Sequence, residues 1–104
     1  MKKNSVGNNV EQVICELFGI TPEELYSGKG NIPFKRAMAR NLCLYLLHDR
    51  YSIFYRQLAE MTGLTQRSVM RCIRKARIYT GYDKEYIKYY NILLNKLSIS
   101  DRIW

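Results

Sequence analysis

Apolar residues recur at intervals of three and four along most of the chain, which is the spacing of amphipathic helices. The first clear series consists of Val10, Val13, Ile14, Leu17 and Phe18. It predicts a helix that starts near residue 10 and ends at Gly19, where the pattern stops. The residues before this helix are polar, so we expect residues 1–9 to form a flexible N-terminus.

The next residues indicate a second, shorter helix. Thr21 can cap its start, and Pro22 fits its first position. Glu23 and Glu24 are favourable at the positive end of the helix dipole. The stretch "GKGNIP" that follows is rich in glycine, asparagine and proline, so it is predicted to be a loop.

From about residue 34 to residue 50 the pattern predicts one long helix. Its C-terminal half contains "LCLYLL", which is apolar nearly all round and indicates a helix buried at the centre of the fold. Its N-terminal end carries Lys35, Arg36 and Arg40 instead. Positive charges at this end oppose the helix dipole, so the arrangement favours an anion nearby.

Two more helices, separated by Gly63, are predicted between residues 54 and 79, and "TGYD" marks the next break. Asp83 can cap a final helix that carries tyrosines and leucines at helical spacing. No segment alternates between apolar and polar residues as a half-buried strand would. The sequence therefore predicts a single all-α domain, residues 10–104, of about six helices with a central helix-turn-helix.

The second helix of this pair has two chemically different faces. At roughly 100° per residue, one face is made of Val69, Cys72, Ile73 and Ala76. Arg67, Arg71 and Arg74 lie on the opposite face, and Ser68 and Lys75 border them. This pattern indicates an apolar face for the core and a stripe of guanidinium groups facing outward.

The turn before this helix has the residue spacing of a helix-turn-helix. Ala59 is small where the two helices would cross, Gly63 permits the tight turn, and Val69 anchors the second helix to the first. In this motif the N-terminal residues of the second helix lead into the DNA major groove. Here those residues are Thr65, Gln66, Arg67, Ser68 and Arg71. Glutamine can pair with adenine and arginine with guanine, while hydroxyls reach phosphates or bases.

The distribution of charge points the same way. The net charge is +8, and residues 28–78 carry eleven Lys and Arg against only Asp49 and Glu60. Such a concentrated excess is typical of a nucleic-acid footprint or of contact with an anionic membrane surface. The candidate DNA-binding residues are Lys29, Lys35, Arg36, Arg40, Arg56, Thr65, Gln66, Arg67, Ser68, Arg71, Arg74 and Lys75.

Cysteine and histidine usage argues against several other classes of protein. Cys15, Cys43 and Cys72 are odd in number and form no C-x-x-C pair, so we expect reduced thiols in a cytoplasmic protein. His48 is the only histidine, which argues against a zinc site and against the Arg/His/Lys cluster that a catalytic tyrosine would need. We therefore predict no metal site, no cofactor and no enzymatic activity. The longest apolar run has six residues, too few to span a membrane, and the polar first residues indicate no secretory leader.

Three stretches of the chain match a known pattern: "CELFGITPEELYS", "ARNLCLYLLHD" and "SVMRCIRKA". The last two are similar to A-R-Q-I-A-M-Y-L-x-R-E and T-V-x-x-A-x-R-K-I in one family. Through these stretches, residues 10–97 resemble the C-terminal DNA-binding domain of the bacterial replication initiator DnaA. The resemblance implies a helix-turn-helix within an all-α fold related to the Trp repressor.

The resemblance also implies roles by position. Arg40 matches an arginine that the family uses at the DNA backbone, and residues 29–36 occupy the place of a basic loop that reaches the minor groove. The recognition helix is expected at about residues 65–78. The chain has "TGLTQRSV" where the family has G-G-R-D-H-[ST]-T-V, so it lacks the Asp-His pair that helps to read the family's target box. We therefore expect a different target sequence. No G-x-x-x-x-G-K-[ST] motif is present, so no nucleotide binding is predicted.

These observations favour a sequence-specific protein that binds double-stranded DNA, as a replication accessory or a transcriptional regulator. The main alternative is a protein-interaction module in which the Tyr-rich C-terminal helix and the basic face bind an acidic partner. The same helix is also a candidate surface for a homodimer. RNA binding fits the charge but not the predicted shape, because RNA readers usually present exposed aromatic residues on a sheet.

Overall fold

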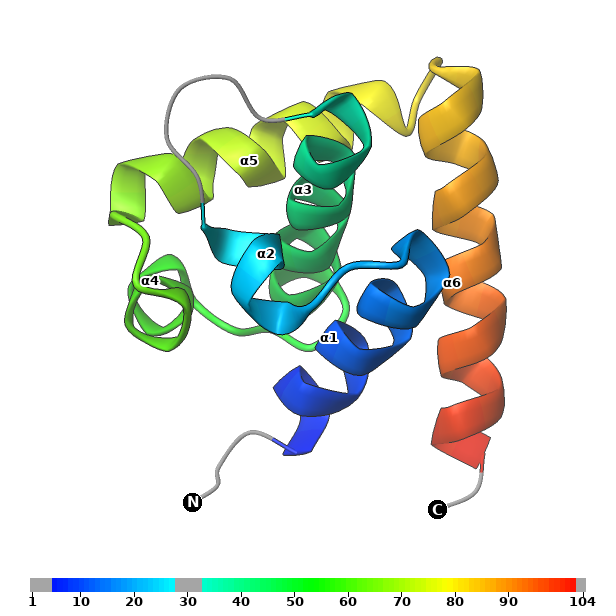
Figure 1. The fold of residues 1–104 in the computed structure, drawn as a ribbon, viewed down its shortest axis with the longest axis horizontal. Coiled ribbons are helices and arrows are strands. Elements are labelled where there is room, and N and C mark those ends of the chain that lie inside the picture. Colours follow the sequence, from blue (N-terminus) through cyan, green and yellow to red (C-terminus); the bar gives the residue numbers. More distant parts are fainter. Residues whose placement is uncertain (1–4, 28–32, 103–104) are drawn as a thin grey trace.

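The structure, a computed structural model, contains six α-helices in the residues that it describes, 5–27 and 33–102 (Figure 1). In chain order they are α1 (Ser5–Phe18), α2 (Pro22–Tyr26), α3 (Phe34–Asp49), α4 (Tyr55–Thr62), α5 (Gln66–Tyr79) and α6 (Lys84–Arg102). None of the described residues belongs to a strand. The prediction of an all-α fold with about six helices is confirmed.

Helix α3 lies at the centre of the fold, as the apolar stretch in its C-terminal half predicted (Figure 1). Helix α5 packs across it, α1 and α2 cover another side, and α6 runs along the outer edge beside α1. The core positions of α3 include Leu42, Leu44, Leu46 and Leu47, all of them buried. Because α3 contacts every other helix in the described chain, it sets the position of the surface that α4 and α5 form.

Side chains cap the starts of α2 and α6 at the positions that the sequence predicted. Thr21 Oγ1 accepts a hydrogen bond from the backbone N–H of Glu24, and the Glu24 carboxylate accepts one from the N–H of Thr21. Asp83 Oδ1 accepts from the N–H groups of Glu85 and Tyr86 at 3.0 and 3.1 Å. These bonds satisfy N–H groups that a helix start otherwise leaves without partners.

The start of α1 differs from the prediction. The helix begins at Ser5, well before Val10, where the apolar series starts. A helix needs no apolar face to extend into a polar segment, because each added residue gains a backbone hydrogen bond once a nucleus exists. The apolar pattern therefore located the buried part of α1 but not its first residue. Residues 1–4 of the expected flexible N-terminus lie outside the described part of the chain.

The corner between α3 and α4 fixes the direction in which α4 leaves the central helix. His48, in the last turn of α3, has its Nδ1 atom 2.8 Å from the carbonyl oxygen of Ile53. Its ring also stacks on Tyr55, the first residue of α4, with 4.5 Å between ring centroids. His48 thus ties the end of α3 to the start of α4.

Candidate nucleic-acid interface

Helices α4 and α5 are joined by a tight turn at Gly63, which has a φ of +80°. A Cβ atom at this position would meet nothing within 4 Å, so the backbone conformation alone requires glycine here. Leu58 in α4 and Val69 in α5 are fully buried and hold the two helices together. The predicted pair of helices, with a tight turn at Gly63 and a buried Val69, is confirmed.

The start of α5 is capped by Thr65. Its Oγ1 atom accepts a hydrogen bond from the backbone N–H of Ser68 at 3.0 Å, and its hydroxyl donates to Ser68 Oγ at 3.0 Å. Both predicted site residues therefore stabilise the helix start. Of the two, only the Ser68 hydroxyl retains a proton to donate to a phosphate or a base.

The outer face of α5 is polar and cationic, as the helical wheel predicted. Its exposed residues include Gln66, Arg67, Met70, Arg71 and Arg74. These five side chains line a shallow groove of about 330 Å³. On the opposite face Val69, Ile73 and Ala76 are buried against the core. The same helix thus has one apolar face packed against the core and one exposed face on which four of these five side chains, all but Met70, can donate hydrogen bonds.

The side chains of Arg67, Arg71 and Arg74, which form a row on this face, make no hydrogen bond or ion pair with any other described residue. A guanidinium group stays protonated at every pH of biological interest and carries five N–H donors. Lys75 is exposed next to them, on the border of the row. This part of the surface is therefore positively charged and has donors available for an anionic partner.

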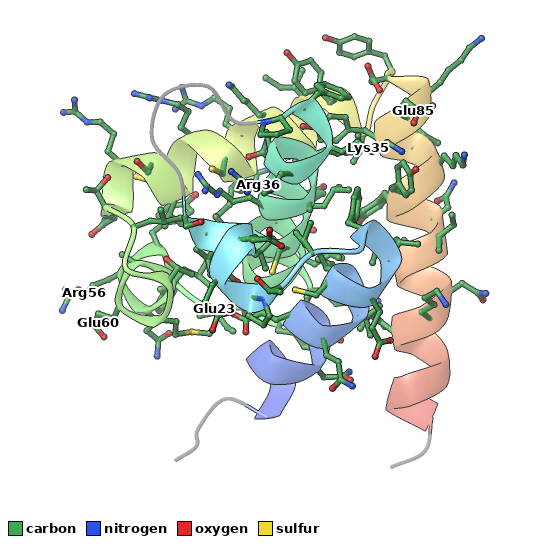
Figure 2. The ribbon with its side chains drawn as sticks, in the orientation of Figure 1. Glu23, Lys35, Arg36, Arg56, Glu60 and Glu85 are labelled. Carbon is green, nitrogen blue, oxygen red and sulfur yellow. The ribbon has the colours of Figure 1, made fainter. Side chains whose placement is uncertain are left out.

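A second groove of about 500 Å³ adjoins the first. It is lined by Phe54, Tyr55, Arg56, Gln57 and Gln66. Because Gln66 borders both grooves, the two form one continuous surface across the start of α4 and the outer face of α5. Arg56 points away from the body of the fold at the outer side of α4, next to Glu60 (Figure 2).

Arg40 does not lie where the sequence interpretation placed it. We expected an exposed side chain at the DNA backbone, but only 9% of Arg40 is accessible. Its Nε donates to the carbonyl oxygen of Leu25 at 3.0 Å, and its Nη2 donates to that of Ser27. These carbonyls lie at the end of α2, where a helix leaves acceptors without partners. The guanidinium of Arg40 therefore caps α2 from inside the fold.

The other predicted residues around the start of α3 separate in space. Lys35 turns toward α6, where its Nζ donates to the Tyr89 hydroxyl at 3.2 Å, so it does not join the surface of α4 and α5 (Figure 2). Arg36 lies on the α5 side of α3, is partly buried, and has a buried Nε without a hydrogen-bond partner. Both residues belong to the first turn of α3, which shortens the loop expected for residues 29–36. Lys29 lies outside the described residues.

Most of the described tyrosines near the C-terminal helix serve the packing of the fold. Tyr86 is 2% exposed, and its hydroxyl accepts a hydrogen bond from Asn41 at 3.0 Å. Tyr89 and Tyr90 are partly buried against Phe18 and Tyr45. These contacts reduce the tyrosine surface that α6 can offer to a protein partner.

The three cysteines are free thiols. Burial raises the pKa of the Cys43 thiol, which lies 3.3 Å from the hydroxyl of Tyr26. That hydroxyl also donates to Glu11 at 2.7 Å, and burial raises its pKa too. No group of His, Cys, Asp and Glu in the described side chains is arranged to hold a metal ion. None of the described helices has the length and apolar character needed to cross a membrane.

Two residues of the combined groove, Phe54 and Met70, were not among the predicted site residues. Phe54 is 71% exposed and Met70 is 37% exposed. Charged and hydrogen-bonding residues are the ones that a sequence marks as candidates for such an interface, whereas its apolar pattern assigns Phe54 and Met70 to the core. Phe54 did leave one sequence signal, since it occupies the position just before α4 where a polar cap is expected.

No protein-family model matches the chain, and no curated protein is significantly similar to it. The resemblance to the DnaA C-terminal domain therefore stays a prediction.

Proposed function

We propose that the protein binds double-stranded DNA, with the outer face of α5 in the major groove. The observation that carries the proposal is the row formed by Arg67, Arg71 and Arg74. These arginines lack partners in the described chain and project from the second helix of a helix-turn-helix. Guanidinium groups in such a row can bind phosphate oxygens and the guanine edge.

The dimensions of α5 support this arrangement. An α-helix with its side chains is about 10–12 Å wide and the major groove of B-DNA is about 12 Å wide, so a helix fits into it. The buried opposite face and the turn at Gly63 hold α5 rigidly against α3 and α4. A rigid recognition element keeps its donors in register with the base edges.

The proposal assigns different tasks to different residues. Gln66 and Arg67, at the start of α5, are the candidates for contacts with base edges, and Arg71 follows one turn later. Arg56 on α4 and Arg74 further along α5 are the candidates for phosphate contacts, which fix the orientation of the protein on the duplex. Arg40 is not among these candidates, because its guanidinium caps the end of α2 inside the fold.

The proposed biological role rests on the resemblance to the DnaA C-terminal domain. We propose a replication accessory or a transcriptional regulator; these 104 residues contain no G-x-x-x-x-G-K-[ST] motif. The free thiols of Cys15, Cys43 and Cys72 fit a location in the reducing cytosol.

Selection of bound sequences from a pool of random duplex DNA tests the proposal. Recovery of a common motif of one half-site is the expected result, because one recognition helix reads only a few successive base pairs. The DnaA target box should not compete better than the selected motif, since the chain lacks the Asp-His pair. No enrichment of any duplex at low salt would contradict the proposed function. A preference of about 1,000-fold for the DnaA box would contradict the expected change of target.

A further inference from the structure

Phe54 occupies the cap position of α4 and is poorly suited to it. Caps are usually Ser, Thr, Asp or Asn, because their side-chain oxygens accept hydrogen bonds from the first N–H groups of the helix. A phenyl ring has no such acceptor. The backbone N–H of Phe54 makes a long bond of 3.4 Å to Gln57 Oε1, and no side chain at the cap position bonds to the first N–H groups of α4.

Three other helices of the chain have suitable side-chain caps, although α3 begins after Pro33 without one. Thr21, Thr65 and Asp83 accept hydrogen bonds at the starts of α2, α5 and α6. At α4 a large aromatic ring stands in this position instead, with 71% of its surface exposed to water. Both features lower stability: the helix start lacks the side-chain bond that a cap supplies, and the ring is not buried. A residue that breaks local rules without a gain in folding is a candidate for a contact with a partner.

The position of the ring indicates which partner it meets. Phe54, Arg56 and Gln66 line one groove of about 500 Å³, and Gln66 is also the first residue of α5 and borders the arginine row. The ring therefore lies on the same surface as the side chains proposed to enter the major groove. It is close to the end of α5 from which base edges are read.

We propose that Phe54 contacts the 5-methyl group of a thymine in the major groove, beside the base pair that Gln66 reaches. The inference rests on the proposed function. The major-groove edges of the four base pairs present hydrogen-bond donors and acceptors, and the thymine methyl is their one apolar group. A phenyl ring cannot donate hydrogen bonds to phosphates or to the polar base edges, as the arginines beside it can. Phe54 thus adds thymine specificity to a surface whose other exposed side chains, apart from Met70, are polar.

The test combines a protein variant with a modified DNA. Wild-type protein first selects its best duplex, and each thymine is then replaced singly by deoxyuridine, which lacks only the methyl group. One replacement should weaken wild-type binding about fourfold, the value expected for one methyl group removed from an apolar contact. The affinity of Phe54→Ser for the thymine duplex should be lower than that of wild type by about fourfold or more. The same deoxyuridine replacement should no longer change the affinity of this variant.

The serine variant separates a lost contact from a damaged fold. Serine at this position can accept from the N–H groups of α4, so Phe54→Ser should melt at the same temperature as wild type or higher. Tyr82→Ser serves as the matched control, because Tyr82 is a 65% exposed aromatic residue in the turn after α5 and borders neither groove. Tyr82→Ser should bind like wild type and remain sensitive to the same replacement.

Distinct results distinguish the two proposals. If wild type binds no duplex, the proposed function fails, and the thymine contact fails with it. If wild type selects and binds a duplex but no single thymine replacement weakens binding, only the thymine contact is overturned. The thymine contact alone is also overturned if Phe54→Ser binds the duplex as tightly as wild type, which is the result expected if the ring contacts a protein partner. It is likewise overturned if Phe54→Ser is as sensitive to the deoxyuridine replacement as wild type.

Discussion

Replacing Arg40 with alanine should destabilise the fold rather than remove a contact with DNA. The variant leaves the carbonyl oxygens of Leu25 and Ser27 without their charged donor, and one of these two bonds is buried. A hydrogen bond to a charged group contributes roughly 1.5–3 kcal/mol. Because Ser27 is exposed and water can replace that bond, we expect a loss of about 2–4 kcal/mol in the free energy of unfolding.

Such a loss is large against the roughly 5–15 kcal/mol by which domains of this kind are stable. For a domain of this size it corresponds to a fall in Tm of about 10–25 °C. Circular dichroism on heating and urea unfolding at constant pH measure the effect. DNA affinity is then measured at a temperature where the variant is fully folded, and it should be close to that of wild type.

Arg71→Ala is the matched control, since Arg71 is exposed and has no partner in the described chain. It should melt like wild type and bind DNA more weakly. The opposite outcome for Arg40→Ala, an unchanged Tm together with lost affinity, would refute the reasoning. It would mean that Arg40 contacts the DNA backbone, as the DnaA resemblance implied, and that its buried hydrogen bonds do not stabilise the fold.

Three further predictions follow from other parts of the structure. Arg71→Ala should cost about 1–3 kcal/mol on the selected duplex and less on random duplex, measured by fluorescence anisotropy; equal losses on both would make Arg71 a phosphate contact only. Gly63→Ala should lower the free energy of unfolding by about 1–2 kcal/mol, because alanine is strained at a φ of +80° although its Cβ has room; unchanged urea unfolding would rule out that conformation. Burial raises the pKa values of Cys43 and Tyr26, so the folded chain keeps protons that the unfolded chain releases above the ordinary thiol pKa of 9.0. The free energy of unfolding should therefore be lower at pH 10 than at pH 7, and equal values would contradict the burial of these groups.

The sequence was sufficient to predict the faces of α5 and the caps of α2 and α6, which depend on residues close together in the chain. The buried and exposed faces of α5 follow from the spacing of Val69 and Ile73 against that of Arg67 and Arg71 within one helix. The caps at Thr21 and Asp83 likewise depend on residues only two or three positions away. Geometry of this kind depends only on residues within a short stretch of sequence. The pair of helices around Gly63 and the cationic face of α5 could therefore be predicted.

The sequence was not sufficient where a side chain's surroundings come from distant parts of the chain. Arg40 is buried because the end of α2 packs beside it, and Lys35 turns away from α5 because Tyr89 of α6 lies within its reach. Both look like exposed cations at the start of a helix when only neighbouring residues are considered. Phe54 was missed for a different reason, since the polarity pattern assigns a phenylalanine to the core by default.

The most direct test of the central claim is a salt titration of duplex binding. Wild-type protein is compared with the variant that carries Arg67→Ala, Arg71→Ala and Arg74→Ala, using fluorescence anisotropy on one duplex. If wild type neutralises roughly five phosphates, log K should fall with log[salt] at a slope of about −4 to −5. The variant should melt like wild type, bind more weakly, and show a slope smaller by as many as three units, depending on how many of the arginines meet phosphates. The account is contradicted if wild type shows no binding at ~50 mM salt and micromolar concentration, or if wild type and variant share the same affinity and slope.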